Sequence, residues 1–346
     1  MLISEKKKLH TKFWKGELER PMLGVFLPYS GPNYPAIDID LPAKKIIEKN
    51  RKRIEFFNNT PDERMPCVWV NYGPVFLGAL AGAKMEWDND TSWSRSLVSS
   101  IDELAPPLFD KNDGLWQDYI AKFIKIKNSY FPNGIIGLTD FMGPFDILAA
   151  LVGSEVLCMD LMFKPEEIEG LAEKCTDLCL ACYNEHFELL PEKDGTTDVF
   201  GLFCPGRGAR WSEDFTALIG PDLYRDFVLS HDTRLAANLD TSYIHIHSAG
   251  IKNLEYILQI PQLSGIEISN DPNGPSLEEI LNWAQEAYGQ GKSVMLSNWK
   301  KRLERKDVEF ILSRIDPSRT IVTLEAKDME EAALWRDMFH ASRSEG

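Results

Sequence analysis

Short apolar runs that alternate with long amphipathic stretches constrain the fold of this chain more than any other feature of its sequence. Continuous apolar runs of this length, rich in β-branched and aromatic residues, are typical of parallel strands that are buried on both faces. Eight such runs predict strands at Met22–Pro28, Cys67–Tyr72, Gly134–Phe141, Val199–Cys204, Ser242–Ser248, Ser264–Ser269, Ser293–Trp299 and Thr320–Glu325.

The stretches between these runs have the sequence pattern of helices. Ala43–Phe57 is amphipathic, Pro165–Leu190 opens with Pro-Glu-Glu, and Ser276–Tyr288 begins with a capping box. Phe215–Leu239 and Asp328–His340 also have helical periodicity. Because strands and helices alternate without a linker, we expect the α/β class and a single domain. The prediction is one (β/α)₈ TIM barrel over residues 1–346, with an N-terminal helical extension.

The charge and composition of the chain argue against two classes of partner. Lys and Arg number 38 against 53 Asp and Glu, which gives a formal net charge of -15. A negative field repels both nucleic-acid phosphates and anionic lipid headgroups. No apolar run approaches the roughly 18 residues that cross a bilayer, and the charged N-terminus lacks a signal peptide. We therefore expect a cytoplasmic protein that acts on a small molecule, without a nucleic-acid or membrane partner.

Two of the six histidines, His245 and His247, lie one residue apart in a predicted strand. Side chains at i and i+2 of a strand point to the same face, so the two imidazoles share a side and Ile244 and Ile246 share the other. On the lumen side of a barrel, the two imidazoles converge on one metal ion. The alternative is a pair of structural histidines whose nitrogens are satisfied by hydrogen bonds.

Carboxylates at other predicted strands are candidates for further ligands. Glu267 lies between two isoleucines, and Glu325 ends the last predicted strand. An unpaired carboxylate is costly to bury in such a strand, so each is expected to meet a cation or an imidazole. Each could instead form a salt bridge to Lys or Arg. Two imidazoles with one or two carboxylates suit Zn²⁺ or another borderline divalent ion.

Four segments follow one another along the chain: ERPMLGVFLPYSGPNYP, GIIGLTDFMGPFDILAALVG, WSEDFTALIGPDLYRDFVLSH and HIHSAG. In this order they resemble the uroporphyrinogen decarboxylase superfamily, which includes the cobalamin-dependent methyltransferases, and the resemblance runs from about Arg20 to the C-terminus. ERPMLGVFLPYSGPNYP is similar to the N-terminal loop of that family, and GIIGLTDFMGPFDILAALVG to its strand followed by a Gly-Pro helix. WSEDFTALIGPDLYRDFVLSH resembles the segment before its fifth strand. HIHSAG resembles the His-x-Cys-Gly motif with which the methyltransferases hold zinc.

The chain departs from the decarboxylases of that superfamily at the positions that matter for their substrate. Their paired arginines fall in Leu27–Tyr34, which has no arginine, and their catalytic aspartate falls near Val70–Gly73, which has no acid. Their tyrosine falls near Ala150 and their late histidine near Glu325. A tetra-acid porphyrinogen requires cationic clamps, so uroporphyrinogen decarboxylation is not expected.

The methyltransferase branch implies a set of metal ligands in this sequence. His245 matches the first ligand, His247 takes the position of a cysteine, and Glu325 falls near a late cysteine. Glu267 lies where the related cobalamin-independent methionine synthases place a ligating glutamate, so it is a fourth ligand or orients another ligand. Because nitrogen and oxygen replace two thiolates, the site is expected to polarise an oxygen rather than a thiol.

Our leading hypothesis is a zinc-dependent methyltransferase that demethylates a small methylated or methoxylated compound onto a corrinoid protein, with homodimerisation possible. Asp140 is the candidate general acid or base, although it would alternatively cap a helix that begins near Gly143. Tyr29 and Glu267 complete the expected catalytic set. The residues expected to line the pocket or bind a cofactor are Tyr34, Asn71, Tyr72, Asn298 and Arg207.

Two other readings of the same barrel stay open. One is a decarboxylase or lyase of a small carboxylate or tetrapyrrole-like substrate, with Arg207 and Arg210 as carboxylate clamps or, more simply, as surface charges. The other is a non-catalytic subunit that binds a corrinoid partner.

Overall fold

A parallel six-stranded sheet is the centre of the fold. The structure is a computed structural model that describes residues 2–27, 36–96, 98–130, 135–191, 193–298 and 301–342. The strand order is β1-β12-β11-β10-β9-β8, and all neighbouring pairs are parallel. The first strand therefore lies beside the last. The strands are β1 (Met22–Phe26), β8 (Gly208–Ser212), β9 (Thr241–His247), β10 (Gly265–Ser269), β11 (Ser293–Ser297) and β12 (Thr320–Glu325).

A second parallel pair, β2 (Cys67–Val68) and β5 (Ile135–Ile136), is linked to this sheet by backbone hydrogen bonds. The chain after β5 reaches β8 through an isolated parallel bridge between Met142 and Ser212. The chain before β2 reaches β1, where the Glu63 amide donates to the Leu23 carbonyl at 2.9 Å. The segments predicted as the first three strands are therefore strands, but the second and third are shorter than the apolar runs that predicted them.

The fourth predicted strand is wrong. Within Val199–Cys204, only the last residues are extended, in β7 (Phe203–Pro205), which pairs antiparallel with β6 (Gly195–Thr197). The strand beside β9 is instead β8, whose residues read Gly-Ala-Arg-Trp-Ser. The apolar pattern missed β8 because a buried arginine, Arg210, interrupts it.

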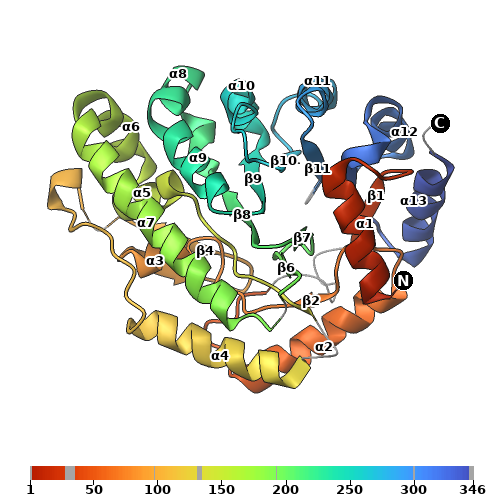
Figure 1. The fold of residues 1–346 in the computed structure, drawn as a ribbon, viewed down its shortest axis with the longest axis horizontal. Coiled ribbons are helices and arrows are strands. Elements are labelled where there is room, and N and C mark those ends of the chain that lie inside the picture. The colour runs from red at the N-terminus through yellow and green to blue at the C-terminus, as the bar shows by residue number, and fades with distance from the viewer. Residues whose placement is uncertain are drawn as a thin grey trace.

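Helices are arranged around the strands, as Figure 1 shows. Four of the predicted helices are present with ends shifted by one or two residues, as α2, α7, α11 and α13. Ser276 caps α11 by accepting a hydrogen bond from the Glu279 amide at 3.2 Å. The segment predicted as one helix, Phe215–Leu239, begins in the 3₁₀ turn η2 (Asp214–Leu218) and is then helical without interruption over residues 221–237, with a π-helical stretch inside. The longer helices are α2 (Ala43–Asn59), α4 (Gly114–Tyr130), α5 (Pro144–Val152), α6 (Ser154–Phe163), α7 (Pro165–Leu189), α9 (Leu229–Ala237), α11 (Leu277–Gly289), α12 (Arg305–Arg314) and α13 (Met329–Ala341).

Shorter elements complete the described chain. One antiparallel hairpin is formed by β3 (Lys84–Trp87) and β4 (Ser92–Arg95). The short helical turns are α3 (Phe76–Leu80), η1 (Ile101–Glu103), α8 (Pro221–Leu223), η3 (Tyr224–Val228), η4 (Ser248–Asn253), α10 (Leu254–Ile257) and η5 (Pro317–Arg319). Across the described ranges, no helix combines the length and the apolarity that crossing a bilayer requires.

The N-terminal helix α1 (Ile3–Lys15) covers the amino ends of the strands. Its Phe13 packs in one buried cluster with Met22 at the start of β1 and Tyr243 near the start of β9. The Ser293 hydroxyl at the start of β11 donates to the Phe13 carbonyl at 2.7 Å, and the Trp14 indole donates to the Phe203 carbonyl at 2.8 Å. With the amino ends covered in this way, the polar groups of the sheet gather at the carboxyl ends.

Candidate functional site

A cavity of about 370 Å³ lies at the carboxyl ends of the strands. Five of the residues that line it are the last residues of five strands: Phe26, Ser212, His247, Ser269 and Ser297. The carboxyl ends of parallel strands are the usual place of ligand sites in α/β folds. The cavity is therefore the candidate functional site.

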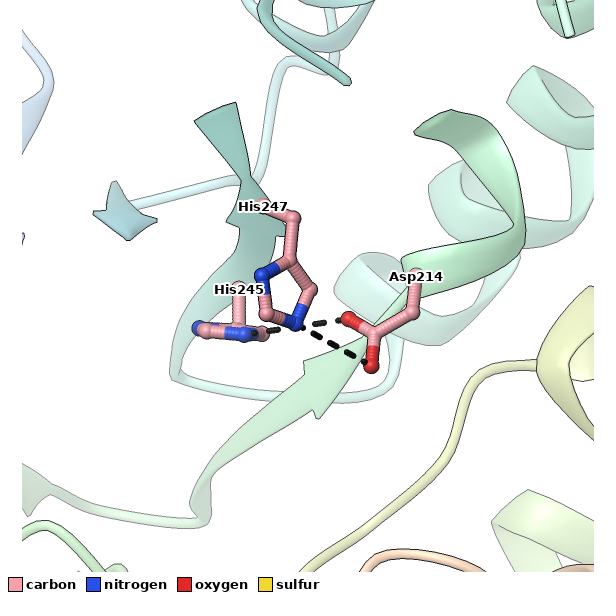
Figure 2. A group of neighbouring side chains, drawn as sticks. All are labelled: Asp214, His245 and His247. Carbon is pink, nitrogen blue, oxygen red and sulfur yellow. Dashed lines mark ion pairs between the residues drawn. The ribbon is translucent and has the colours of Figure 1, made fainter. Parts of the chain in front are cut away.

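The two histidines of β9 point together toward one carboxylate from the neighbouring strand connection, as Figure 2 shows. Nε2 of His245 lies 3.7 Å from Oδ1 of Asp214, and Nε2 of His247 lies 3.6 Å from Oδ2 of the same residue. One ligand atom from each of the three residues lies within 4.8 Å of the other two. This spacing allows the three side chains to hold one metal ion.

Each histidine has a second carboxylate close to its other ring nitrogen, in an ion-pair contact for His245 and in a hydrogen bond for His247. Nδ1 of His245 lies 3.2 Å from Oε2 of Glu267, which is its partner across β9 and β10. Nδ1 of His247 lies 3.0 Å from Oδ1 of Asp271, and Asp271 is itself fixed by the amide and hydroxyl of Ser248, both at 2.9 Å. A carboxylate on one ring nitrogen orients an imidazole and leaves its second nitrogen for a metal.

Asp214 is placed by the turn that follows β8. Asp146 of α5 accepts hydrogen bonds from the Asp214 amide at 3.0 Å, the Phe215 amide at 2.8 Å and the Ser212 hydroxyl at 3.0 Å. Oδ1 of Asp214 is buried and accepts no hydrogen bond from the part of the chain that the structure describes. A buried acceptor without a donor is rare in native proteins, and a cation would satisfy it.

The charges of the site shift the pKa values of three of its members so that each favours its ionised form. Burial alone would raise the pKa of Glu267, but the charges of His245 and Arg210 outweigh burial and lower it to about 2. For Asp214, burial is likewise outweighed by the interaction with His247 and by nearby positive charges, and its pKa is lowered. The carboxylate of Asp214 in turn raises the pKa of His247 to about 9. The carboxylates are therefore ionised and the pair of imidazoles is in an anionic field that favours a cation.

Arg210 of β8 joins two of the predicted catalytic carboxylates. Its Nη1 donates to Oδ1 of Asp140 at 2.6 Å, and its Nε donates to Oε2 of Glu267 at 3.0 Å. Asp140 lines the cavity, and its side chain accepts a hydrogen bond from Arg210 rather than from a described amide of α5, whose N-cap residue is Gly143. Burial raises the pKa of Asp140. The alternative role of Asp140 as a helix cap is therefore not seen.

The predicted residues divide into those that the cavity brings together and those that lie elsewhere. Asn71 lines the cavity together with Asp140, His245, His247 and Glu267. Tyr29 and Tyr34 fall outside the described residues, so these two predictions have no structural outcome.

Glu325 does not join the two histidines. It ends β12, beside Phe26 of β1, and β11 and β10 separate β12 from β9. It neither lines the cavity nor belongs to the group of potential ligands among the described side chains. Among the described side chains, the carboxylate close enough to share an ion with both histidines is that of Asp214.

Three further residues expected in the pocket lie outside its lining. The Tyr72 hydroxyl donates to Asp118, because Tyr72 follows Asn71 and points away from the cavity. The Asn298 amide donates to the Thr323 carbonyl at 3.0 Å and is used in the loop structure after β11. Arg207 is exposed and donates to Asn184 on the surface.

Among the cavity residues that sequence reasoning missed are Asp214, Asp271, Arg53 and Arg64. The signal for Asp214 and Asp271 was present, since each lies two residues after the end of a strand, β8 and β10. Asp214 was passed over because β8 itself was not predicted. Arg53 and Arg64 come from α2 and the loop after it, and no local pattern marks them as cavity residues.

Comparisons with known proteins give a structural likeness only. No family model matches the chain, and no curated protein sequence matches it. A solved structure of a methyltransferase from Methanosarcina mazei superposes with a TM-score of 0.68 at 14% sequence identity, covering 96% of this chain and 98% of that chain. A GH18 chitinase from Pseudoalteromonas aurantia gives a TM-score of 0.40 at 12% identity, covering 93% of this chain and 99% of that chain, which supports no inference. The chain therefore shares the fold of the Methanosarcina mazei methyltransferase.

Proposed function

We propose that the protein is a metal-dependent methyltransferase whose metal ion is held by Asp214, His245 and His247. The observation that carries this proposal is the convergence of two Nε2 atoms on one carboxylate, while another carboxylate lies 3.2 Å from Nδ1 of His245 and 3.0 Å from Nδ1 of His247. The shared fold with the Methanosarcina mazei methyltransferase supports the reaction class.

The donor set fits zinc or a similar divalent ion. Two imidazole nitrogens and a carboxylate oxygen leave further coordination positions for a substrate, as in catalytic zinc sites. No cysteine is among the described residues that line the cavity, and Cys204 lies in the buried cluster under α1. Harder donors of this kind favour a substrate that presents oxygen, such as a methyl ether.

The chemistry that such a cation supplies is polarisation of the heteroatom that carries the methyl group. The bond between methyl carbon and oxygen breaks, its electron pair stays on the oxygen, and the acceptor provides the pair that forms the new bond to carbon. We assign delivery of a proton to the departing oxygen to the carboxyl group of Asp140, because burial raises its pKa and it lines the cavity. Glu267 and Asp271 hold the imidazoles in place.

The proposal includes the architecture and the partner. The adjacency of β1 and β12, together with the links between β5 and β8 and between β1 and the chain before β2, supports closure of residues 1–346 into one (β/α)₈ barrel. A corrinoid protein is the proposed methyl acceptor, and it would reach the cavity from the carboxyl ends of the strands.

The two arginines expected as substrate clamps give the decarboxylase alternative no support. The clamps expected for it were Arg207 and Arg210. Arg207 is on the surface, and Arg210 is engaged by both Asp140 and Glu267. Neither of these arginines offers a free guanidinium to a substrate carboxylate.

Metal binding is the first test. Protein purified without chelator is analysed for metal, and the Kd for Zn²⁺ is measured by competition with a chromophoric chelator. We expect about one ion per chain, and a loss of affinity of about 100-fold or more in His245→Ala, His247→Ala and Asp214→Asn. His340→Ala, an exposed histidine of α13, is the matched control and should bind as the wild type does. Equal affinity in all four variants would refute the site.

Methyl transfer is the second test. The metal-loaded protein is mixed with a methoxylated compound and reduced cobalamin, and methylcobalamin is followed by its absorbance. We expect turnover that disappears after chelation and returns with Zn²⁺. Release of carbon dioxide without methylcobalamin would instead establish a lyase.

A further inference from the structure

Arg53 of α2 is a buried cation without a carboxylate partner. Its side chain lines the cavity and the residue is only 7% exposed. Among the residues that the structure describes, no Asp or Glu forms an ion pair with it. Its Nη2 donates to the Val199 carbonyl at a long 3.4 Å, and its buried Nε has no hydrogen-bond partner in the described chain.

The other two arginines of the cavity are each neutralised by the protein. Arg64 donates to Asp62 through Nε and through Nη2, the latter at 2.7 Å, and Arg210 is held by Asp140 and Glu267. All three guanidinium groups lie over aromatic rings, but among the described residues only Arg53 has no carboxylate paired with it. Its guanidinium carbon lies 5.4 Å from the ring centre of Phe57 and 5.8 Å from that of Trp69.

An unpaired guanidinium is expensive to bury, and proteins that bury a charge pair it or bind a counter-ion. The planar guanidinium also matches an oxyanion through two parallel hydrogen bonds. Burial lowers the pKa of Arg53, which agrees with a charge that the protein itself does not compensate. The missing partner is therefore expected to arrive with the ligand.

The cavity lining contains two groups of residues with opposite charge preferences. Asp214, in the turn after β8, and the two imidazoles of β9 favour a cation. Arg53, with the apolar faces of Phe57 and Trp69, favours an anion attached to a flat or apolar body.

We propose that Arg53 binds the carboxylate of a small substrate whose apolar body lies against Trp69 and Phe57. The subsite itself is independent of the metal. On the proposed function, another end of the same substrate faces Asp214 and the imidazoles. The substrate class is then a carboxylate that carries a methylated heteroatom.

Binding of simple carboxylates tests the subsite. Acetate, phenylacetate and benzoate are titrated calorimetrically into the full chain, each beside its neutral amide. We expect at least one carboxylate to bind about ten times or more tightly than its amide. Arg53→Met should weaken that carboxylate by about 10- to 100-fold and leave the amide unchanged. Arg53→Lys, which keeps the charge but loses the planar fork, should fall between the two.

A control and a folding measurement separate binding from structure. Arg207→Met removes a surface arginine that stacks on Phe187 and should change carboxylate affinity less than twofold, roughly the scatter of such measurements. Arg53→Met should unfold at the same temperature as the wild type or higher, because it removes an uncompensated buried charge.

The outcomes distinguish this inference from the proposed function. A metal-loaded protein in which Arg53→Met binds carboxylates like the wild type, or in which no probe binds at millimolar concentration, overturns the subsite alone. A protein that binds no metal but shows the Arg53-dependent preference overturns the proposed function and leaves the subsite standing.

Discussion

Replacing Glu267 with glutamine removes the charge that holds Arg210 and His245 together. Glu267 is fully buried, 3.0 Å from Nε of Arg210 and 3.2 Å from Nδ1 of His245. Its pKa is lowered from 4.5 to about 2 in the fold. A difference of that size between the folded and unfolded states corresponds to roughly 3 kcal/mol of stability at neutral pH. Glu267→Gln should therefore lower the free energy of unfolding by about 3 kcal/mol.

The pH dependence gives the same prediction an independent check. Because the folded-state pKa of Glu267 lies below the unfolded value, its contribution is complete above pH 4.5 and is lost as the pH falls toward 2. The wild type and Glu267→Gln should thus differ by a constant amount from pH 7 to pH 5 and converge at lower pH.

The assay is chemical denaturation of chelator-treated protein, so that metal does not contribute. Glu309→Gln is the matched control, because Glu309 is exposed and pairs with Arg305 across one turn of α12. An exposed pair of this kind contributes about 0.5 kcal/mol or less. A destabilisation by Glu267→Gln no larger than that of the control would refute the reasoning.

Three further predictions concern other parts of the structure. Asp271→Asn should weaken Zn²⁺ binding about 10-fold in the chelator competition assay, because it weakens the contact that orients the His247 imidazole. The loss should be smaller than in His247→Ala, which removes the imidazole itself. An unchanged Kd for Zn²⁺ would contradict the orienting role of Asp271. Gly143→Ala would place a methyl carbon 2.8 Å from the Ser212 carbonyl oxygen at the end of β8, so the thermal unfolding midpoint of this variant should fall. Gly170→Ala in α7 places its methyl group in open space and should not lower the midpoint. Equal midpoints for the two variants would contradict the close packing at Gly143. Burial lowers the pKa of His10 to about 4, so the unfolded chain binds more protons than the folded chain and the free energy of unfolding declines as the pH falls from 6.5 toward 4. In denaturation curves measured over this pH range, His10→Gln should reduce the decline. The same decline in the wild type and in His10→Gln would contradict this prediction.

The sequence predicted those parts of the fold whose pattern is local. Ile244 and Ile246 alternate with His245 and His247, so the strand and its polar face could both be read from neighbouring residues. The strand β8 could not be read in this way. Its Arg210 is stabilised by Asp140 and Glu267, 70 and 57 positions away in the chain, and no short window contains that information.

The candidate site was predictable to a similar extent. The histidine pair follows from the two-residue period of a strand, and Glu267 follows from the cost of burying a carboxylate. The third potential ligand depends on tertiary structure, because Asp146 of α5 fixes the turn that presents Asp214. Glu325 was expected because it ends the last predicted strand and, by resemblance, falls near a late cysteine, but the strand order separates it from β9.

X-ray absorption at the zinc edge of the metal-loaded protein tests the central claim most directly. We expect a first shell of nitrogen and oxygen at about 2.0–2.2 Å with the outer scattering of two imidazoles, and one imidazole in His245→Ala. Sulfur in the first shell at about 2.3 Å, or two imidazoles that persist in His245→Ala, would contradict a centre built from Asp214, His245 and His247.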